Sequence, residues 1–322
     1  MNTHPLAPFK DDLQEIEHQL DRSLGCEHPL IQEVARYIIL SGGKRIRPIL
    51  TVAASRLFGG DDQEAYRLSV VPEYLHAASL LHDDVVDQGE LRRGKTPAYR
   101  VWGNRVTILS GDYLYARAIE IASTFKDPEI DAVIARTVKM MAEGEIIQLV
   151  KARDMTMDLD AYYEIVERKT GALIASSCAI GAILGGAQKD EAMNLWRFGD
   201  NLGKAFQIVD DCLDYCADEG DFGKAIGTDL KDKKITMPLI HAFRLADTRA
   251  HEIHGVLEKD QVTHQDISFV SSIVWRSGAI EASYLQAQRH IEDAIKELNK
   301  APPSPTRDHL EAISKYILTR RR

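Results

Sequence analysis

Apolar residues recur every three or four positions along almost the whole of this 322-residue chain, and this helical period constrains the fold more than any other feature. In the segment 11–24, for example, Leu13, Ile16, Leu20 and Leu24 fall on one stripe. Signals for strands are scarce, because the sequence has no series of alternating β-branched runs closed by Asn-Gly or Asp-Gly turns. The sequence therefore predicts an all-α protein.

The helical period also predicts where the helices lie. The expected segments are 11–24, 29–40, 49–57, 62–87, 106–122, 129–151, 159–169, 171–184, 190–215, 238–246, 266–277, 279–299 and 307–319. Glycine and proline gather between these segments, and none of the loops is long or low in complexity. Although the length would allow two domains, we expect one large helical bundle, a single domain over residues 1–322.

The most apolar stretch, Ala172 to Ala187, is rich in small residues and too short to span a bilayer. We expect it to form a buried helix that its neighbours approach closely. The N-terminus has no apolar signal core. The four cysteines form neither a CxxC pair nor a cluster at zinc-ligand spacing: Cys26, Cys178, Cys212 and Cys216. These features predict a cytoplasmic protein with reduced thiols.

The charge balance is acidic. Forty Lys and Arg residues stand against 49 Asp and Glu residues, which gives a formal net charge of −9. Sequence-independent binding to nucleic acid needs a basic surface that displaces counterions. The composition therefore argues against a nucleic-acid partner.

Two segments repeat one acidic pattern, DDxxD, and each follows an apolar run. The first aspartate-rich motif holds Asp83, Asp84 and Asp87, and the second holds Asp210, Asp211 and Asp214. Helical residues four apart lie on one face, so we expect the three carboxylates of each motif to project together at a helix end. Negative charge is unfavourable at the C-terminal end of the helix dipole, so each cluster needs a cation.

Ligands made only of oxygen favour a hard cation such as Mg²⁺, which typically joins carboxylates to substrate phosphates. A single DDxxD could equally be a solvated, acidic helix end. Two copies, each preceded by apolar residues, favour a pair of magnesium-binding motifs.

Basic residues accompany both acidic motifs. The segment GGKRIRP at 42–48 holds three cations, Arg92-Arg93-Gly94 follows the first motif, and four lysines follow the second: Lys224, Lys231, Lys233 and Lys234. Arginine and lysine are the residues that bind phosphate, although such loops can also be solvated surface. The chain has no GxxxxGK[ST] motif of a nucleotide-binding P-loop. Acids and bases together predict diphosphate substrates, and the long apolar stripes would suit an apolar tail.

In this order, the motifs resemble those of the trans-polyprenyl diphosphate synthases, or polyprenyl synthetases, and most of all the octaprenyl diphosphate synthase group. The segments that carry the resemblance are GGKRIRP, HDDVVD with LRRG, EGEIIQL, Lys169-Thr170, FQIVDDCLD and GKAIGTDLKDKKITMP. The resemblance implies an isoprenoid synthase type I fold around a deep central cavity, and a homodimer. The implied reaction is successive condensation of isopentenyl diphosphate onto an allylic diphosphate such as farnesyl diphosphate.

The resemblance also implies roles for individual residues. The six aspartates of the two motifs would hold about three Mg²⁺ ions per active site. The allylic diphosphate would be bound by Arg92, Lys169, Lys224 and Lys234, and isopentenyl diphosphate by Lys44, Arg47, His76 and Arg93. Thr170 and Gln207 would lie near the developing allylic cation, and with Lys169 they form the catalytic set. In the run Lys231 to Lys234, which departs mildly from the family spelling, the spacing to Thr236 favours Lys234 as the phosphate ligand.

Two motifs have plainer alternatives. His76 lies seven residues before Asp83, on nearly the same helix face, and without the resemblance it would be a satisfied core histidine. Glu143 and Glu145 flank Gly144 and could suggest acid–base catalysis. We expect a structural or supporting role for them, because the implied reaction needs no carboxylate base.

The length of the product is expected to depend on the residues four and five positions before the first motif. These are Ser79 and Ala78, which are small and leave room for a growing chain. The sequence therefore favours a medium-to-long product of the octaprenyl type, which supplies quinone side chains. A deeper floor is expected within Val133 to Met141, whereas Tyr74, Tyr113 or a partner residue could close the path early and give a geranylgeranyl- or farnesyl-length product.

Two other functions fit the sequence less well. A class I terpene cyclase also ionises diphosphates with Mg²⁺, but it has no need of the GGKRIRP segment or a second DDxxD. A non-catalytic subunit that binds prenyl diphosphates typically loses motif aspartates, and all six are present. We expect no membrane-spanning segment, and peripheral membrane contact for product release stays open.

Overall fold

The structure, a computed structural model, describes residues 5–89, 91–92, 94–152, 154–215 and 227–319. These residues form helices joined by short connections, and none of the described residues lies in a β-strand. An isolated bridge between Arg92 and Lys95 is the β-type pairing found there. The all-α prediction is confirmed.

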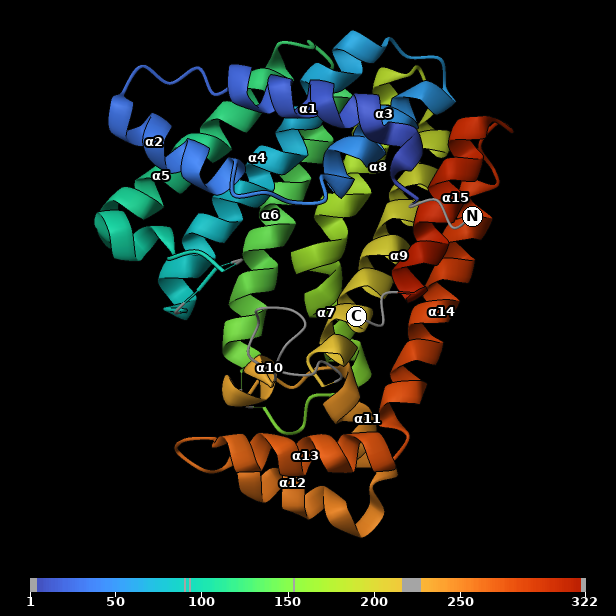
Figure 1. The fold of residues 1–322 in the computed structure, drawn as a ribbon. Helices are drawn as coiled ribbons and strands as arrows, with labels where there is room; N and C mark the ends of the chain where they lie inside the picture. Colours follow the sequence, from blue (N-terminus) through green and yellow to red (C-terminus); the bar gives the residue numbers. More distant parts are fainter. Residues whose placement is uncertain (1–4, 90, 93, 153, 216–226, 320–322) are drawn as a thin grey trace. The chain divides into compact units, whose positions relative to one another are not determined.

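The helices agree with the predicted segments in most places (Figure 1). The long elements are α1 (Lys10–Arg22), α2 (Pro29–Ile39), α3 (Ile46–Leu57), α4 (Asp62–Asp87), α5 (Ala98–Ser123), α6 (Pro128–Lys151), α7 (Leu159–Val166), α8 (Ala172–Leu184), α9 (Lys189–Leu213), α11 (Met237–Leu245), α12 (Ala250–Leu257), α13 (His264–Arg276), α14 (Ala279–Leu298) and α15 (Pro305–Thr319). The short ones are η1 (Ala7–Phe9), η2 (Glu167–Gly171), α10 (Thr228–Lys231) and η3 (Asp247–Arg249).

Three differences from the prediction have local causes. Helix α5 begins at Ala98, before the predicted 106, and Gly103 interrupts it with φ 80° and ψ 159°. Such a conformation is open to glycine and breaks the helical period on which the prediction rests. The sequence missed α10 and α12 because they have four and eight residues, too short to show a clear period.

The chain falls into two compact units. Unit 1 comprises Met1–Lys139, Leu173–Gly199 and Lys296–Ile313, and unit 2 comprises Met140–Ala172, Asp200–Ile295 and Ser314–Arg322. The boundaries fall inside α6, α8, α9, α14 and α15. That the chain acts as a single domain stays a prediction.

Close packing of α8 against α3 organises part of unit 1. Residues 172–182 of α8 are all buried. A Cβ atom added at Gly181 would overlap the backbone oxygen of Thr51, and one added at Gly185 would overlap that of Ser55. The expected buried helix with closely approaching neighbours is confirmed, and the small residues are there because larger ones would not fit.

A buried arginine joins four helices of unit 1. Arg45 precedes α3 with φ 49°, and its side chain is 2% exposed. It donates hydrogen bonds to Glu17 of α1 (2.6 Å), to Glu73 of α4 (2.7 Å) and to the carbonyl oxygen of Ile39 in α2 (2.6 Å). Burial lowers the pKa of Arg45, but the hydrogen bonds and charges of the two glutamates outweigh this effect and raise its pKa. Arg45 is therefore a structural cation of the GGKRIRP segment.

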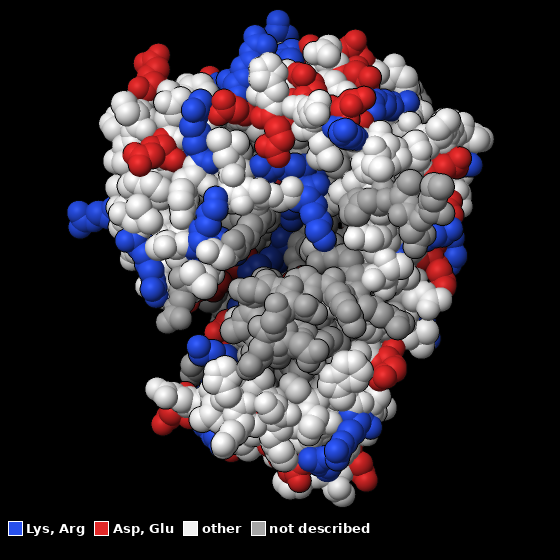
Figure 2. Space-filling view, in the orientation of Figure 1, with Lys and Arg blue, Asp and Glu red and all other residues white. Residues whose placement is uncertain are grey.

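The surface in Figure 2 carries acidic and basic side chains interspersed with one another. The excess of carboxylates is therefore not gathered into one acidic patch on the face shown. No described helix combines the length and the apolar character that crossing a membrane requires.

The contacts of Arg45 predict a large loss of stability in Arg45→Met. Removing one partner leaves Glu73, whose side chain is 6% exposed, as an unpaired buried charge, and this costs about 3–5 kcal/mol. The control is Arg36→Met, because Arg36 pairs with Asp21 while both side chains are more than 40% exposed. That variant is expected to lose less than about 1 kcal/mol. Urea unfolding measures both, and equal midpoints would contradict this account of Arg45.

Candidate active site

The first aspartate-rich motif lies at the C-terminal end of α4, in unit 1, as predicted. The helix begins at a cap in which the Asp61 carboxylate accepts the backbone N–H groups of Gln63 and Glu64. It ends where Gln88 adopts φ 52°. Asp84 is buried, Asp83 is half-buried and Asp87 is exposed. The three carboxylates of the motif therefore differ strongly in their access to solvent.

Asp84 has one carboxylate oxygen engaged and one that lacks a partner. Its Oδ1 accepts a hydrogen bond from Nε of Arg92 at 2.6 Å. Its Oδ2 is buried and has no hydrogen-bond partner among the described residues. A buried polar atom without a partner is costly, and a cation would satisfy it. The residues at this helix end therefore fit a divalent metal.

The other predicted residues of unit 1 are distributed over α3 and α4 and the loops beside them. Lys44 is exposed and Arg47 is half-buried in α3. His76 is half-buried, Ala78 is buried, and the Ser79 hydroxyl donates to the carbonyl oxygen of His76 at 2.9 Å. Arg93 lies outside the described residues.

Two tyrosines considered as barriers to chain growth are held by α1 and the residues just after it. Tyr74 donates a hydrogen bond from its hydroxyl to the carbonyl oxygen of Leu20, and Tyr113 donates to that of Leu24, both at 2.6 Å. These bonds satisfy backbone groups at the C-terminal end of the helix. Both tyrosines therefore have a structural role in unit 1.

In unit 2, the residues Lys169 and Thr170 lie in a π-helical turn. The sequence predicts an α-helix to Lys169, but α7 ends at Val166 and η2 continues as a π-helix over Glu167–Gly171. Single π-turns are rare and occur frequently at functional sites. The ammonium group of Lys169 contacts Oε1 of Glu145 and Oε1 of Gln148, each at 2.7 Å.

A chain of hydrogen bonds joins the π-turn to the second aspartate-rich motif. The Thr170 hydroxyl donates to Oε1 of Gln207 at 2.9 Å. The Gln207 amide then donates to Oδ1 of Asp211 at 2.8 Å, and the Tyr162 hydroxyl donates to Oδ2 of Asp211 at 2.5 Å. Both oxygens of this buried carboxylate are thus held in place. The structure brings Thr170, Gln207 and Asp211 together, as the shared role predicted for the first two requires.

The last aspartate of the second motif lies beyond its helix, which corrects the prediction of a helix to residue 215. Helix α9 ends at Leu213, and the carboxylate of Asp214 accepts the backbone N–H groups of Thr228 (3.2 Å) and Asp229 (3.0 Å). Asp214 therefore fixes the start of α10. Lys234 forms an ion pair with Asp232 at 3.3 Å, and Lys224 lies outside the described residues.

A buried carboxylate, that of Asp211, and several half-buried ones lie around the second motif. Burial, followed by the charge of Asp214, raises the pKa of Asp229 to about 7 against the opposing effect of Lys234. Burial and the charge of Asp229 likewise raise the pKa of Asp211 well above its usual range, although Tyr162 and Gln207 stabilise its charged form. Neighbouring acids that cannot all ionise would be stabilised by a cation. This motif therefore also fits a divalent metal.

No group of three or more His, Cys, Asp or Glu side chains within the described ranges is arranged to hold a metal by itself. The expectation that the three carboxylates of each motif project together toward a cation therefore stays a prediction. Mg²⁺ is usually bound by one or two carboxylates together with substrate phosphates and water, so this arrangement suits that metal.

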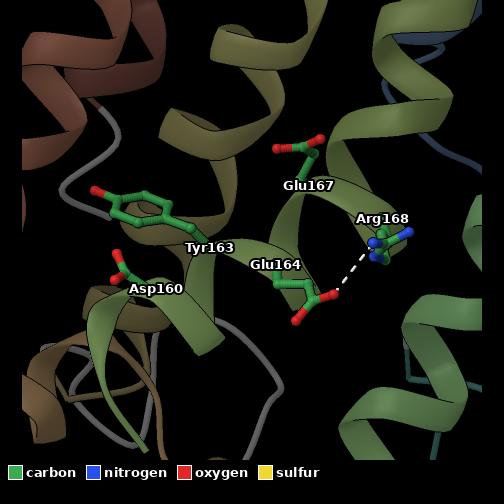
Figure 3. A pocket seen from close by; sticks show the side chains of 5 residues that line it. All are labelled: Asp160, Tyr163, Glu164, Glu167 and Arg168. Atoms are coloured by element: carbon green, nitrogen blue, oxygen red, sulfur yellow. Dashed lines mark hydrogen bonds and ion pairs between the residues drawn. The ribbon is translucent and has the colours of Figure 1, made fainter.

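An open pocket of about 300 Å³ lies beside α7 and the π-turn (Figure 3). Its walls are formed by five side chains, none of them predicted from the sequence: Asp160, Tyr163, Glu164, Glu167 and Arg168. Arg168 contacts Glu164 at 3.1 Å and Glu143 at 2.8 Å. This pocket is distinct from the predicted site residues.

Sequence reasoning missed the polar residues that form hydrogen bonds with the predicted site residues. These are Tyr162, Gln148 and Asp229. Helical phase could have singled out Tyr162, because it lies on one stripe with the buried residues Ile165 and Val166. The contact of Gln148 with Lys169 joins two separate helical segments, and no local signal reveals it.

Known proteins resemble this chain in sequence over nearly its whole length. A family model described as polyprenyl synthetase matches residues 28–274. The heptaprenyl diphosphate synthase component 2 of Bacillus subtilis (strain 168) is 34% identical over 310 residues, which cover 96% of this chain and 88% of that protein. The octaprenyl diphosphate synthase of Escherichia coli (strain K12) is 32% identical over 312 residues, which cover 97% of this chain and 96% of that protein.

The fold resembles solved structures to the same extent. A polyprenyl synthase from Caulobacter crescentus CB15, solved with calcium and isoprenyl diphosphate, has a TM-score of 0.91 and 33% sequence identity. The match covers 99% of this chain and 97% of that one. Sequence and fold thus agree on one family, whose members use a divalent metal. The chain belongs to the polyprenyl synthetase family, has the isoprenoid synthase type I fold and is a prenyltransferase.

Proposed function

We propose that this chain condenses isopentenyl diphosphate successively onto an allylic diphosphate and forms a medium-to-long, all-trans polyprenyl diphosphate. The observation that carries the proposal is the pair of acidic motifs, each with a buried carboxylate and polar side chains that hold it. The names of the relatives, heptaprenyl and octaprenyl diphosphate synthase, support the product class. An octaprenyl-type product for a quinone side chain fits best. Cytoplasmic localisation, predicted from the sequence, is part of the proposal.

The proposed metal is Mg²⁺, about three ions in all, with the aspartates of the two motifs and the diphosphates as the proposed ligands. The unpartnered Oδ2 of Asp84 and the raised pKa of Asp229 support a cation at each motif. The calcium found in the Caulobacter crescentus structure supports a divalent ion. When bound, Mg²⁺ would stabilise the negative charge that develops on the leaving diphosphate.

The proposed reaction forms one carbon–carbon bond in each catalytic cycle. The carbon–oxygen bond of the allylic diphosphate breaks, and the diphosphate leaves with the electron pair. Arg92, Lys169 and Lys234 stabilise this departing charge, since cations fixed in advance act most strongly where charge develops. The double bond of isopentenyl diphosphate then attacks the allylic carbon, and a proton passes to the released diphosphate.

The remaining site residues align the second substrate. Lys44, Arg47 and His76 are proposed to bind the phosphates of isopentenyl diphosphate. Because both substrates are then held in one site, the bimolecular attack becomes effectively unimolecular. The Thr170 hydroxyl and the Gln207 amide, joined at 2.9 Å, are proposed to face the cationic carbon. Arg93 and Lys224 complete the proposed set.

We also propose a homodimer. Helix α5 leaves several large apolar side chains exposed, among them Val101 (51%), Leu109 (63%) and Ile119 (50%). Large exposed apolar patches mark surfaces for association, so these side chains on one helix support the proposal. A molar mass from light scattering of twice the chain mass of 36.1 kDa would support the homodimer. A monomer active only with a different subunit would contradict it.

A product assay tests the proposed function directly. The purified chain with Mg²⁺, labelled isopentenyl diphosphate and farnesyl diphosphate is expected to yield linear prenols after removal of the diphosphate. Chromatography against prenol standards gives their length, and products longer than the geranylgeranyl type are expected. A cyclic hydrocarbon would favour a terpene cyclase, and the absence of turnover would favour a non-catalytic subunit.

Removing a motif carboxylate is expected to abolish most of the activity while the fold is kept. Asp83→Ala and Asp210→Ala should each lower turnover by about two orders of magnitude or more, because a lost ligand leaves the leaving group less stabilised. The control is Asp190→Ala, at the opposite end of α9. Turnover against Mg²⁺ concentration and circular dichroism measure the two properties. Near-normal Mg²⁺-dependent turnover would contradict the metal assignment.

Enlarging Ser79 is expected to shorten the product. Ser79→Phe places a bulky ring one helical turn before Asp83, where the growing chain is proposed to pass. Ser79→Ala is the matched control, because it removes the hydroxyl without adding bulk, and it should leave the lengths unchanged. An identical product distribution for all three proteins would mean that Ser79 does not line the path of the chain.

A further inference from the structure

A segment of α6 that the proposed reaction leaves without a role binds the π-turn at consecutive residues. Glu143 contacts Arg168 at 2.8 Å, and Glu145 contacts Lys169 at 2.7 Å. All four residues lie in unit 2. The two ion pairs thus match neighbouring acids of α6 with neighbouring bases of η2.

The glycine between these acids lets the two backbones meet. A Cβ atom added at Gly144 would lie 2.8 Å from the backbone nitrogen of Lys169 and 2.9 Å from Cβ of Arg168. Real Cβ atoms essentially never approach so closely, and here one of the neighbours is backbone, which yields little. Gly144 therefore allows α6 to touch the π-turn at the residue that carries the ammonium group.

The ammonium group of Lys169 is held on two sides by one turn of α6. Glu145 and Gln148 lie three positions apart, so their side chains share a helix face. Nζ of Lys169 donates to Oε2 of Glu145 at 2.8 Å and to Oε1 of Gln148 at 2.7 Å, and Oε1 of the same glutamate lies 2.7 Å away. A lysine ammonium has three N–H donors. One N–H directed at the Glu145 carboxylate and one at Gln148 leave a third donor, whose direction is fixed by the other two.

We propose that Glu145 and Gln148, with Gly144 between the backbones, are positioning residues that aim the third N–H of Lys169 at a diphosphate oxygen. The proposal rests on the role of Lys169 in the proposed function. Lysine is a flexible point charge, so its direction must come from its neighbours. A donor already aimed at the leaving group needs no reorganisation when charge develops there.

A double-mutant cycle tests whether Glu145 acts through Lys169. Glu145→Ala is expected to lower kcat/KM for the allylic diphosphate about tenfold, the size that accompanies loss of a hydrogen bond to a charged group. In the Lys169→Ala background the same change should cost less than about twofold, because the group that it positions is gone. Glu143→Ala is the matched control, since its partner Arg168 keeps a second carboxylate, Glu164.

A second cycle tests whether the close approach of the two backbones at Gly144 also acts through Lys169. Gly144→Ala is expected to lower kcat/KM about tenfold in the unaltered background and less than about twofold with Lys169→Ala. The control is Gly255→Ala in α12, where an added Cβ meets nothing within 4 Å. Thermal unfolding of every variant shows whether the fold is kept.

The outcomes separate the proposed positioning role of Glu145 from the proposed prenyl transfer on which it rests. An equal loss from Glu145→Ala in both backgrounds would mean that Glu145 acts elsewhere, and it would overturn the positioning role. Lys169→Ala with unchanged kcat/KM would overturn it as well, while leaving prenyl transfer itself in place. Failure of the unaltered chain to transfer prenyl groups would overturn the proposed function on which the inference rests.

Discussion

Burial of carboxylates is the constraint on which the two candidate sites depend. A buried carboxylate is stable only when hydrogen bonds or cations replace the water that it has lost. Asp84 is matched by Arg92, and Asp211 by Tyr162 and Gln207. The side chains around each motif thus serve to hold its buried carboxylate in place. The part of the negative charge that they leave uncompensated is what we propose to attract a metal.

The same principle explains why the predicted cations are found beside acids. Arg92 and Lys169 are proposed to grip a diphosphate, and both are held by carboxylates in the described structure. A carboxylate orients such a group and keeps it charged, and an arginine or lysine has several donors, so one partner does not exhaust it. Each cation therefore has a defined direction before substrate arrives.

Much of the fold and of the candidate site could be predicted from the sequence, because helical period and residue type are local properties. The bounds of α4 were predicted correctly, and so was the place of its aspartates at the helix end. The π-turn was missed, and it lies where α6 meets Lys169 across Gly144, a contact between distant segments that no local signal reveals. The position of Asp214 beyond α9 was missed for the same reason, since its partners Thr228 and Asp229 lie fourteen and fifteen residues away.

Asp214 belongs to two structures at once, the acidic motif and the start of α10. Its carboxylate accepts two backbone N–H groups of the segment that leads to Lys234. If a metal is bound better when this segment is ordered, then by thermodynamic reciprocity the metal orders the segment by the same free energy. Metal affinity and the local unfolding of residues 227–234 would then be two measures of one equilibrium.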